Sequence, residues 1–247
     1  MGRGGATMKT LSLVIPCKDE SKRLKPDEFI RATKQWPWLS FWFIDDGSTD
    51  ATSDCLARLV SASPAIHAVH LPENRGKAEA VRTGVVRICD MADSDLIGFW
   101  DADLATPLDN IPEFVRQFDT STSVSAVIGS RWPHLGASIR RSALRGAAAA
   151  IIKSAIRRIL KAPVWDTQCG AKIFTREIAA ELFAKPFRTK WLFDVEILRR
   201  LGRKRLISQV CELPVSEWHD VPGSKMGLKA SLSSLFELAI VSRGKMS

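Results

Sequence analysis

The sequence lacks the features of a membrane-spanning, secreted or disulfide-bonded chain. No apolar run approaches the roughly 18–20 residues that a membrane-spanning helix needs. No apolar segment follows the basic start MGRGGATMKT, so no secretory signal is expected. The five cysteines form no CxxC pair and close no short loop, which predicts reduced thiols in a cytosolic protein. Repeats, low-complexity segments and Pro/Gly-rich linkers are absent too, so we expect one folded domain with a sizeable core over the 247 residues.

Acidic residues are missing between Thr120 and Trp165, and this gap holds most of the excess positive charge. The net charge is +9, and eight lysines and arginines lie in the gap, while the remainder of the chain is close to neutral. Such a basic block predicts an anionic partner, either phosphate groups, nucleic acid or a lipid surface, with a solvated basic face as the alternative. The eight residues are Arg131, Arg140, Arg141, Arg145, Lys153, Arg157, Arg158 and Lys161.

Strand-like and helical patterns alternate in the first half of the chain. The apolar, β-branched run Leu11–Cys17 predicts a buried strand, and similar runs lead into Asp45, Asp101 and Arg131. This alternation predicts an α/β domain whose mostly parallel central sheet is flanked by helices. Ligands of such sheets bind at the carboxyl ends of the strands, so we expect the polar residues that end these strands to meet at one edge.

The second half is expected to contain two amphipathic helices. Residues 139–161 have the apolar spacing of a long helix, with Ser138 as its cap. On this helix Arg141 and Arg145 fall among the apolar positions and should face inward or toward a ligand. A further amphipathic helix is expected at 226–247, after a folded domain over 8–225. The apolar faces of both helices suit either a membrane surface or packing on the sheet.

Two carboxylates, Asp101 and Asp103, come directly after a strand-like run. Residues two apart on an extended segment point to the same side, so both can bind one cation. One or two carboxylates, completed by water and substrate phosphates, are the usual ligands of Mg²⁺ or Mn²⁺. The pair therefore predicts a divalent metal site that neutralises a diphosphate.

A second acid pair, Asp45–Asp46, ends the preceding strand-like run. One carboxylate there is expected to accept a hydrogen bond from a base or a ribose hydroxyl, while one acid among this pair and Asp50 caps the next helix. The turn before Lys77 opens another helix, where free backbone N–H groups and basic side chains suit a phosphate or nucleotide. A plain capping turn is the alternative.

Eight segments in order give the sequence a resemblance to glycosyltransferase family 2, from about Leu11 to Lys225. They are VIPCKDE, IDDGSTD, NRGKAEAVRTG, WDADLAT, GSR, DTQCGAKIFTR, WLFDVEIL and EWHDVPGSK. Within the family the chain is most similar to the polyprenyl-phosphate sugar synthases. The dolichyl-phosphate glucose synthases are closest, and the mannose synthases come next. The resemblance implies a single GT-A (Rossmann-like) domain that transfers a hexose, with inversion, from a nucleotide-diphosphate sugar to a lipid phosphate.

The resemblance also implies roles for individual residues. The nucleotide would be held by Pro16, Glu20, Ile44 and Asp46. The metal ligands would be Asp101 and Asp103, and Asp103, Arg131 and Arg145 would be catalytic. Phosphates would be contacted by Arg131 and Lys225, and the acceptor phosphate by Arg145 and Arg141. Further substrate-binding residues would be Lys77, Asp166, Gln168, Asp194, Glu196 and His219. Three of these acids are expected to orient the arginines or to bind sugar hydroxyls, with helix capping or structural salt bridges as the alternative. They are Asp166, Asp194 and Glu196.

Three departures from the family pattern affect these roles. Cys17 stands where an aromatic residue would stack on the base. Ala105 replaces a glutamine that is frequent in mannose synthases, which argues against GDP-mannose. His219 replaces an arginine of the mannose synthases, so its phosphate contact is in question.

The favoured function is transfer of glucose from UDP-glucose to a polyprenyl or dolichyl phosphate with Mg²⁺ or Mn²⁺. The expected setting is the cytoplasm, with the protein peripheral on the cytoplasmic face of a membrane and without a nucleic-acid partner. Alternatives are a GDP-mannose or soluble-saccharide transferase of the same family, and a non-catalytic module that binds anionic lipid or nucleic acid. The intact acids Asp46, Asp101 and Asp103 argue against such a module, because they would repel an anion.

Overall fold

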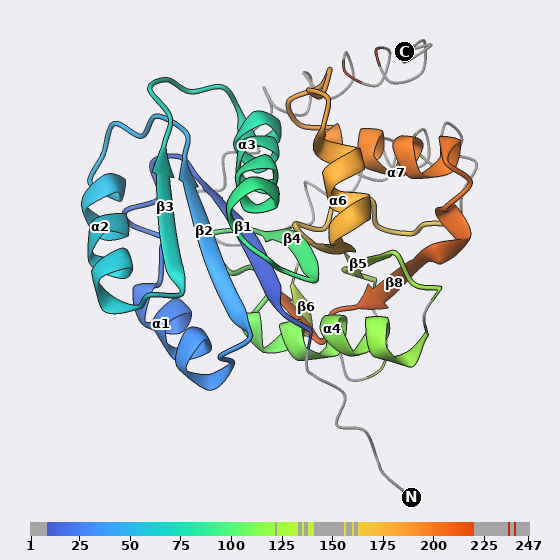
Figure 1. Cartoon of the computed structure of the whole chain (residues 1–247), viewed down its shortest axis with the longest axis horizontal. Coiled ribbons are helices and arrows are strands. Elements are labelled where there is room, and N and C mark those ends of the chain that lie inside the picture. Colours follow the sequence, from blue (N-terminus) through green and yellow to red (C-terminus); the bar gives the residue numbers. More distant parts are fainter. Residues whose placement is uncertain are drawn as a thin grey trace, which may run out of the picture.

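The computed structural model of the chain describes residues 9–121, 123–132, 135, 138–140, 156, 160, 163–219, 237 and 240. Its central sheet has seven strands in the order β3-β2-β1-β4-β7-β5-β8 (Figure 1). The central strands are β1 (Leu11–Cys17), β2 (Leu39–Asp45), β3 (Ile66–His70), β4 (Leu96–Trp100), β5 (Ala126–Ser130), β7 (Ala171–Thr175) and β8 (Val210–Pro214). Only β7 pairs antiparallel, with β4 and β5; the other pairs of this sheet are parallel. The predicted α/β class and mostly parallel sheet are confirmed.

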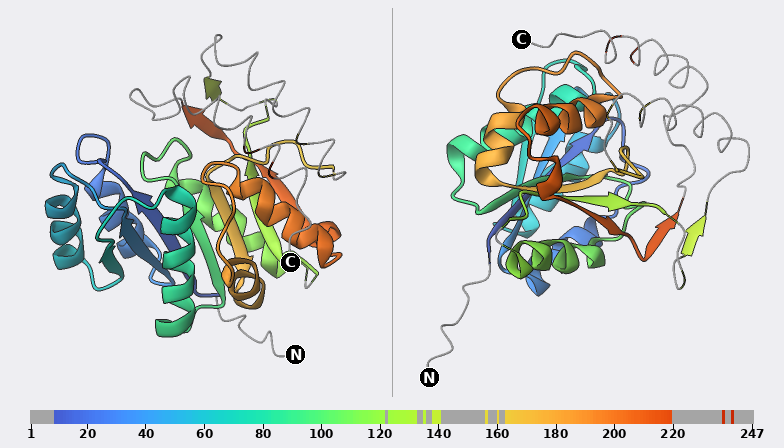
Figure 2. Two further views of the ribbon diagram at one scale, coloured as in Figure 1. Left: turned by 90° about the horizontal axis from the view of Figure 1, so that it is seen from above. Right: turned by 90° about the vertical axis from the view of Figure 1, so that its right-hand side faces the viewer.

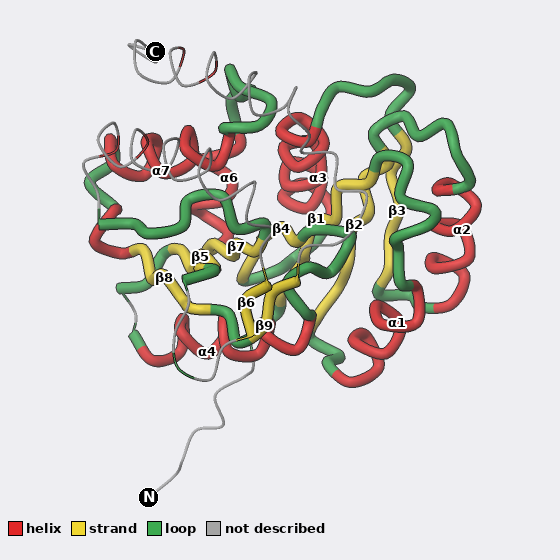
Figure 3. Tube along the Cα trace, turned by 180° about the vertical axis from the view of Figure 1, so that it is seen from behind, coloured by secondary structure: helices red, strands yellow, loops and turns green. Residues whose placement is uncertain are grey.

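Helices cover both faces of the sheet (Figures 1 and 3). One hydrophobic cluster joins the sheet to the helices of the first face, and a second cluster joins it to those of the other. On the first face are α1 (Pro26–Gln35), α2 (Thr52–Ala62), the short 3-10 helix η1 (Leu108–Asn110) and α4 (Ile111–Thr120). On the other are α3 (Lys77–Met91), α6 (Arg176–Phe183) and α7 (Phe193–Arg203). A second 3-10 helix, η2 (Ile207–Gln209), precedes β8.

The alternation of side chains on β1 explains these two layers. Leu13 and Ile15 pack into the first cluster, whereas Val14 points to the opposite face and packs under α3. Gly84 lets α3 approach the sheet closely, because a Cβ atom at that position would lie 2.6 Å from Val14 Cγ1. The close approach fixes α3, and with it Lys77 at the first turn of this helix.

The expected helix over 139–161 is wrong at its beginning. Ser138–Arg140 forms strand β6, which pairs in parallel with β9 (Glu217–His219), and Ser138 N–H donates to the carbonyl of Ser216 at 3.0 Å. Helical periodicity in one segment carries no information about a strand partner almost eighty residues later, so the sequence did not reveal this ribbon. Figure 2 shows β6 and β9 beyond one end of the central sheet.

Two described residues bear on the apolar face expected over 151–161. Ile156 is fully buried, and Leu160 packs against the cluster under α3. At these two positions the face packs on the core, which favours packing over membrane contact there. The other residues of 141–162 lie outside the described residues, as does most of the tail at 226–247.

Candidate active site

The polar ends of β2, β4 and β5 meet at one edge of the sheet, because these three strands run parallel. Asp45 and Asp46 end β2, Asp101 and Asp103 follow β4, and Arg131 follows β5. The β6–β9 ribbon adjoins this edge, since His219 N–H donates to the carbonyl of Ala105 at 3.2 Å, just beyond Asp103. The predicted convergence of strand ends is confirmed.

Each carboxylate of the Asp101–Asp103 pair faces a cation from another segment. Lys77 Nζ lies 2.5 Å from Asp101 Oδ1, and Arg23 Nη1 lies 3.8 Å from Asp103 Oδ2. Burial and the charge of Asp101 raise the pKa of Asp103, against the opposing effects of the Ala105 N–H and the two cations. Burial lowers the pKa of Lys77, but the charges of Asp101 and Asp194 outweigh it and the pKa is raised.

Asp101 also rests against the backbone of Gly170. A Cβ atom at position 170 would lie 1.8 Å from Asp101 Oδ2 and 2.1 Å from its carboxyl carbon. Any other residue would therefore push the carboxylate away. Gly170 is a positioning residue that the sequence analysis missed, although it lies inside the segment DTQCG.

The pair provides hard oxygen donors of the type that Mg²⁺ and Mn²⁺ prefer. Among the described residues no group of three or more His, Cys, Asp or Glu side chains is placed to hold a metal. Two carboxylates on one short segment therefore fit a divalent ion whose remaining ligands are water and substrate phosphates. Asp101 and Asp103 would hold such an ion.

Arg131 is fixed by a two-pronged ion pair with Asp166. Its Nε and Nη2 donate to the two carboxylate oxygens at 2.6 and 2.8 Å, and its backbone N–H donates at 3.0 Å. The side chain of Asp166 is 2% exposed and that of Arg131 is 18% exposed. The pKa of Arg131 is raised overall. Burial lowers it, but the charge of Asp166 and its hydrogen bonds outweigh this effect, and the charge of Asp101 adds to the rise. Asp166 thus orients an arginine, one of the roles expected for it.

Asp166 is in turn held by Glu212, which the sequence analysis did not single out. Asp166 N–H donates to Glu212 Oε1 at 2.7 Å, and Trp165 N–H donates to Oε2 at 2.8 Å. Gln168, expected near the substrate, donates its backbone N–H to Asp166 at 3.3 Å. Its side chain is half-buried, and its substrate role stays a prediction.

Both acids at the end of β2 accept hydrogen bonds from within the protein, whereas one was expected to accept from a base or a ribose hydroxyl. Both oxygens of Asp46 accept backbone N–H groups, from Arg75 at 2.7 Å and from Gly76 at 2.8 Å. The expectation of free N–H groups at this turn is therefore wrong for these two residues. Asp45 accepts from Ser48 N–H and lies 3.0 Å from His70 Nδ1, so its carboxylate serves the turn after β2.

Asp50 lies just before α2, and its carboxylate joins the first residue of that helix to Ser21. It accepts from Thr52 N–H at 3.0 Å and from Ser21 Oγ at 2.6 Å. Although burial raises its pKa, the hydrogen bonds from Ser21 and Thr52 lower it to about 2. The expectation that one of three acids caps this helix is wrong, because the N-cap residue is Ala51 and no side-chain cap hydrogen bond forms there.

Asp194 forms a buried ion pair, the alternative expected for it, with Lys172, a partner that the sequence did not reveal. Lys172 Nζ lies 2.6 Å from Asp194 Oδ1 and 2.6 Å from the Cys169 carbonyl, and the lysine side chain is 0% exposed. Burial raises the pKa of Asp194, while the charges of Lys172 and Lys77 oppose the rise. Lys172 lies on β7, and the sequence AKIFT of this strand did not indicate that the lysine side chain would be buried.

Glu196 anchors a loop. Its Oε1 accepts from Arg188 N–H at 3.0 Å and from Thr189 N–H and Oγ1 at 2.7 and 2.6 Å, and the residue is fully buried. A similar anchor comes from Glu237, whose carboxylate accepts the N–H groups of Lys190, Trp191 and Leu192 just before α7. Glu196 thus has a structural role in this loop, although its contacts are neither the helix cap nor the salt bridge that was the expected alternative.

The remaining candidates occupy different surroundings. Ile44 is fully buried under α3, so only its backbone can reach a nucleotide. Glu20 is buried and pairs with Arg23, Pro16 is half-buried on β1, and the half-exposed His219 side chain pairs with Glu217. Their nucleotide and phosphate roles stay predictions. Three expected phosphate ligands lie outside the described residues: Arg141, Arg145 and Lys225.

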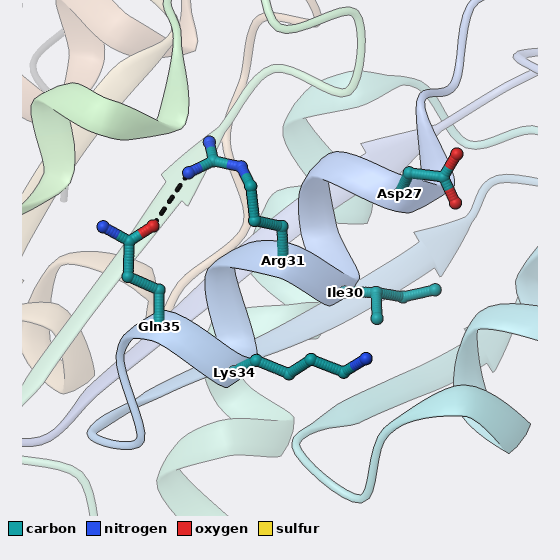
Figure 4. A pocket seen from close by; sticks show the side chains of 5 residues that line it. All are labelled: Asp27, Ile30, Arg31, Lys34 and Gln35. Carbon is teal, nitrogen blue, oxygen red and sulfur yellow. Dashed lines mark hydrogen bonds between the residues drawn. The ribbon is translucent and has the colours of Figure 1, made fainter.

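A surface hollow on α1 contains none of these candidates (Figure 4). All its lining residues belong to that one helix, and Arg31 there donates to Gln35 at 2.8 Å.

The profile of Glycosyl transferase family 2 matches residues 12–183, which include the acid pair, Arg131 and Gly170. The chain belongs to this family. A dolichyl-phosphate beta-glucosyltransferase of Trichomonas vaginalis is 32% identical over 94% of this chain and 74% of its own. Enzymes of the same description from Saccharomyces cerevisiae and Homo sapiens are 32% and 30% identical, over 88% of this chain and 69% and 70% of theirs. The protein is therefore a glycosyltransferase.

Solved structures confirm the GT-A fold. Glucosyl-3-phosphoglycerate synthase of Mycobacterium tuberculosis in complex with UDP has a TM-score of 0.67 and 18% identity, over all of this chain and 88% of that chain. Its complex with Mn²⁺, UDP and glucosyl-3-phosphoglycerate has a TM-score of 0.66 and 19% identity, over 96% of this chain and 86% of that one. No helix among the described residues is long and apolar enough to cross a membrane.

Proposed function

We propose that this glycosyltransferase moves glucose, with inversion, from UDP-glucose to a dolichyl or related polyprenyl phosphate. The observation that carries the proposal is the acid pair Asp101–Asp103 at the carboxyl end of β4, near the guanidinium of Arg131 that Asp166 holds in place. Relatives named dolichyl-phosphate beta-glucosyltransferases support the choice of sugar and acceptor, since the match spans 88–94% of this chain.

The charges of the site suit an acceptor that is itself an anion. A phosphate monoester carries its own nucleophilic oxygen, so the enzyme needs no strong general base. Its main task is to hold two anions in the right orientation and to offset the charge that develops on the leaving diphosphate. Arg131 serves this task by presenting a fixed guanidinium to a phosphate. A divalent ion at Asp101 and Asp103 would supply further neutralisation of the leaving group.

We further propose that the enzyme acts as a peripheral protein at the cytoplasmic face of a membrane, where a lipid phosphate is accessible. An aromatic pair next to the site supports this setting. Trp132 and Trp165 are 52% and 46% exposed, with ring centroids 4.6 Å apart, and they adjoin Arg131 and Asp166 in the chain. Indole rings favour the membrane–water interface, where one side is apolar and the other wet.

The test combines two donors with three acceptors. Radiolabelled UDP-glucose or GDP-mannose is incubated with dolichyl phosphate, 3-phosphoglycerate or a neutral saccharide, with Mn²⁺ or with EDTA, and label is measured in the lipid and aqueous products. We expect label in lipid only from UDP-glucose, dolichyl phosphate and Mn²⁺ together. Transfer only to a soluble acceptor, or only from GDP-mannose, would contradict the proposal. If neither transfer nor donor hydrolysis is detected, the protein is instead a non-catalytic binding module.

Two variants separate the roles at the strand ends. Asp103→Ala should abolish transfer, and Arg131→Ala should lower it by about 10²-fold or more, as expected for loss of a group that stabilises developing charge. Lys9→Met is the control, because Lys9 forms a surface ion pair with Asp119 and precedes the amino end of β1, whereas the site lies at the carboxyl ends of the strands. Arg145→Ala, at an expected acceptor ligand, should lose lipid transfer and retain slow hydrolysis of the donor.

A further inference from the structure

One carboxylate of the site is held on two sides. Asp101 Oδ1 accepts a hydrogen bond from Lys77 Nζ at 2.5 Å, and Asp101 Oδ2 lies against Gly170, with no room for a Cβ atom. The carboxylate therefore has little freedom to turn away from Lys77. A divalent ion that binds Oδ1 would therefore meet the positive charge of the ammonium group.

The backbone just before Lys77 is held in place by a hydrogen bond to Asp46. Lys77 is the first residue of α3, and Gly76 before it has φ 91° and donates its N–H to Asp46 at 2.8 Å. The backbone is thus tied to the end of β2, while the long side chain keeps the rotatable bonds that let its charged end move. The Lys77 side chain is 28% exposed and that of Asp101 is 33% exposed, so solvent and solutes reach the pair.

An ammonium group and a divalent ion on this carboxylate oxygen would be two positive charges in close contact. The lysine carries three donors and no acceptor, so it cannot act as a metal ligand while it is protonated. Two cations so close repel each other, and the repulsion is strong where water is partly excluded. A nucleotide diphosphate changes this balance, because its oxygens ligate the metal and also provide a new anionic partner for the lysine.

We propose that Lys77 is the counter-cation of the metal-free site. The Lys77 ammonium group leaves Asp101 when a divalent ion binds there, and it then pairs with the donor diphosphate. This inference rests on the proposed function and adds an order of events to it. Metal alone competes with Lys77, whereas metal and UDP each help the other to bind. By linkage, the factor by which UDP tightens metal binding equals the factor by which the metal tightens UDP binding.

The test measures Mn²⁺ binding directly, by electron paramagnetic resonance of free Mn²⁺, with and without UDP. For the unmodified protein we expect weak binding of Mn²⁺ alone and tightening by about 10-fold or more with UDP, within the usual range of coupling between sites. For Lys77→Met we expect Mn²⁺ alone to bind about 10-fold more tightly than in the unmodified protein, and the gain from UDP to shrink. Lys77→Gln provides a second neutral variant, and thermal unfolding shows which variants are folded.

Two controls make the result specific. Lys77→Arg keeps the positive charge and should keep weak binding of Mn²⁺ alone. Lys9→Met removes a lysine whose Nζ is 3.1 Å from a carboxylate oxygen of Asp119, and it should leave Mn²⁺ binding unchanged.

The outcomes separate this inference from the proposed function. If the folded neutral variants bind Mn²⁺ alone no more tightly than the unmodified protein, or if Lys77→Arg behaves as they do, the inference is wrong while the proposed function stands. If the unmodified protein binds no Mn²⁺ even with UDP, the metal-dependent function and the inference both fail.

Discussion

The buried ion pair between Lys172 and Asp194 permits a sharp test of the reasoning about this site. The lysine is 0% exposed and donates to Asp194 and to the Cys169 carbonyl, both at 2.6 Å, while its Nζ lies 5.3 Å from the centre of the Phe99 ring. Lys172→Met keeps a long unbranched side chain and removes the charge. It leaves the buried carboxylate of Asp194 without this partner.

The size of the effect follows from the burial of the pair. Removing one partner of a buried ion pair costs about 3–5 kcal/mol, because the other charge remains in a medium of low dielectric constant. The domain as a whole has about 5–15 kcal/mol of stability. We therefore expect Lys172→Met to lower the free energy of unfolding by about 3–5 kcal/mol near neutral pH.

The loss should also depend on pH, with a definite sign. Burial raises the pKa of Asp194 above its ordinary value of 3.8, and Lys172 opposes that rise. Between 3.8 and the raised pKa the folded protein binds more protons than the unfolded chain, so stability falls as pH rises through this window. Without Lys172 the pKa rises further and the window extends upward. The variant should therefore lose less stability at pH 5 than at pH 8.

The measurement is urea unfolding at both pH values for the unmodified protein, Lys172→Met and the double variant Lys172→Met/Asp194→Asn. The double variant should recover part of the loss at pH 8, since asparagine carries no charge to bury. A loss below about 1 kcal/mol in the single variant, typical of an exposed pair, would refute the argument. So would an equal loss at pH 5 and pH 8.

Three further predictions test single positions. Gly170→Ala should displace Asp101 and weaken Mn²⁺ binding in the presence of UDP. Gly202→Ala is the control. A Cβ atom at position 202 would have nothing within 4 Å, so this variant should change the free energy of unfolding by no more than about 1 kcal/mol. Glu196→Gln should lower that free energy by about 1–3 kcal/mol in urea unfolding. Its KM for the donor should stay unchanged, and a large rise in KM would instead assign Glu196 to the substrate. Asp50, whose pKa is held at about 2, stabilises the fold above pH 3.8 and loses this effect as pH falls toward 2, so Asp50→Asn should flatten the acid limb of stability against pH.

The sequence predicted what is encoded locally. Apolar runs that end in acids marked β2 and β4, and the parallel arrangement then brought Asp46, Asp101 and Arg131 to one edge. The sequence also indicated that Asp101 and Asp103 act together, although they lie in a turn closed by the Leu104 N–H and the Asp101 carbonyl and not on the extended segment that was expected. These features depend on neighbours within a few residues, which a sequence shows directly.

The missed features all depend on contacts between distant segments. Lys172 is an inward-facing lysine because β7 inserts antiparallel between β4 and β5, and nothing in its neighbours indicates that pairing. Glu212 and Gly170 owe their roles to the approach of Asp166 and Asp101 from other parts of the chain. The β6 strand was mistaken for a helix start for the same reason, since its partner β9 lies far along the sequence.

Four of the ion pairs at this edge differ in exposure in a way that bears on their function. In the two outer pairs every side chain is 16–33% exposed, whereas each inner pair contains a side chain that is 2% or less exposed. A pair that solvent reaches costs less to break than a buried pair, which leaves an unpaired charge behind when one partner is lost. We therefore expect a metal ion and its diphosphate to displace the outer pairs, whereas the inner pairs stay intact, so that Asp166 keeps Arg131 in place for a phosphate. The outer pairs are Lys77–Asp101 and Arg23–Asp103, and the inner pairs are Arg131–Asp166 and Lys172–Asp194.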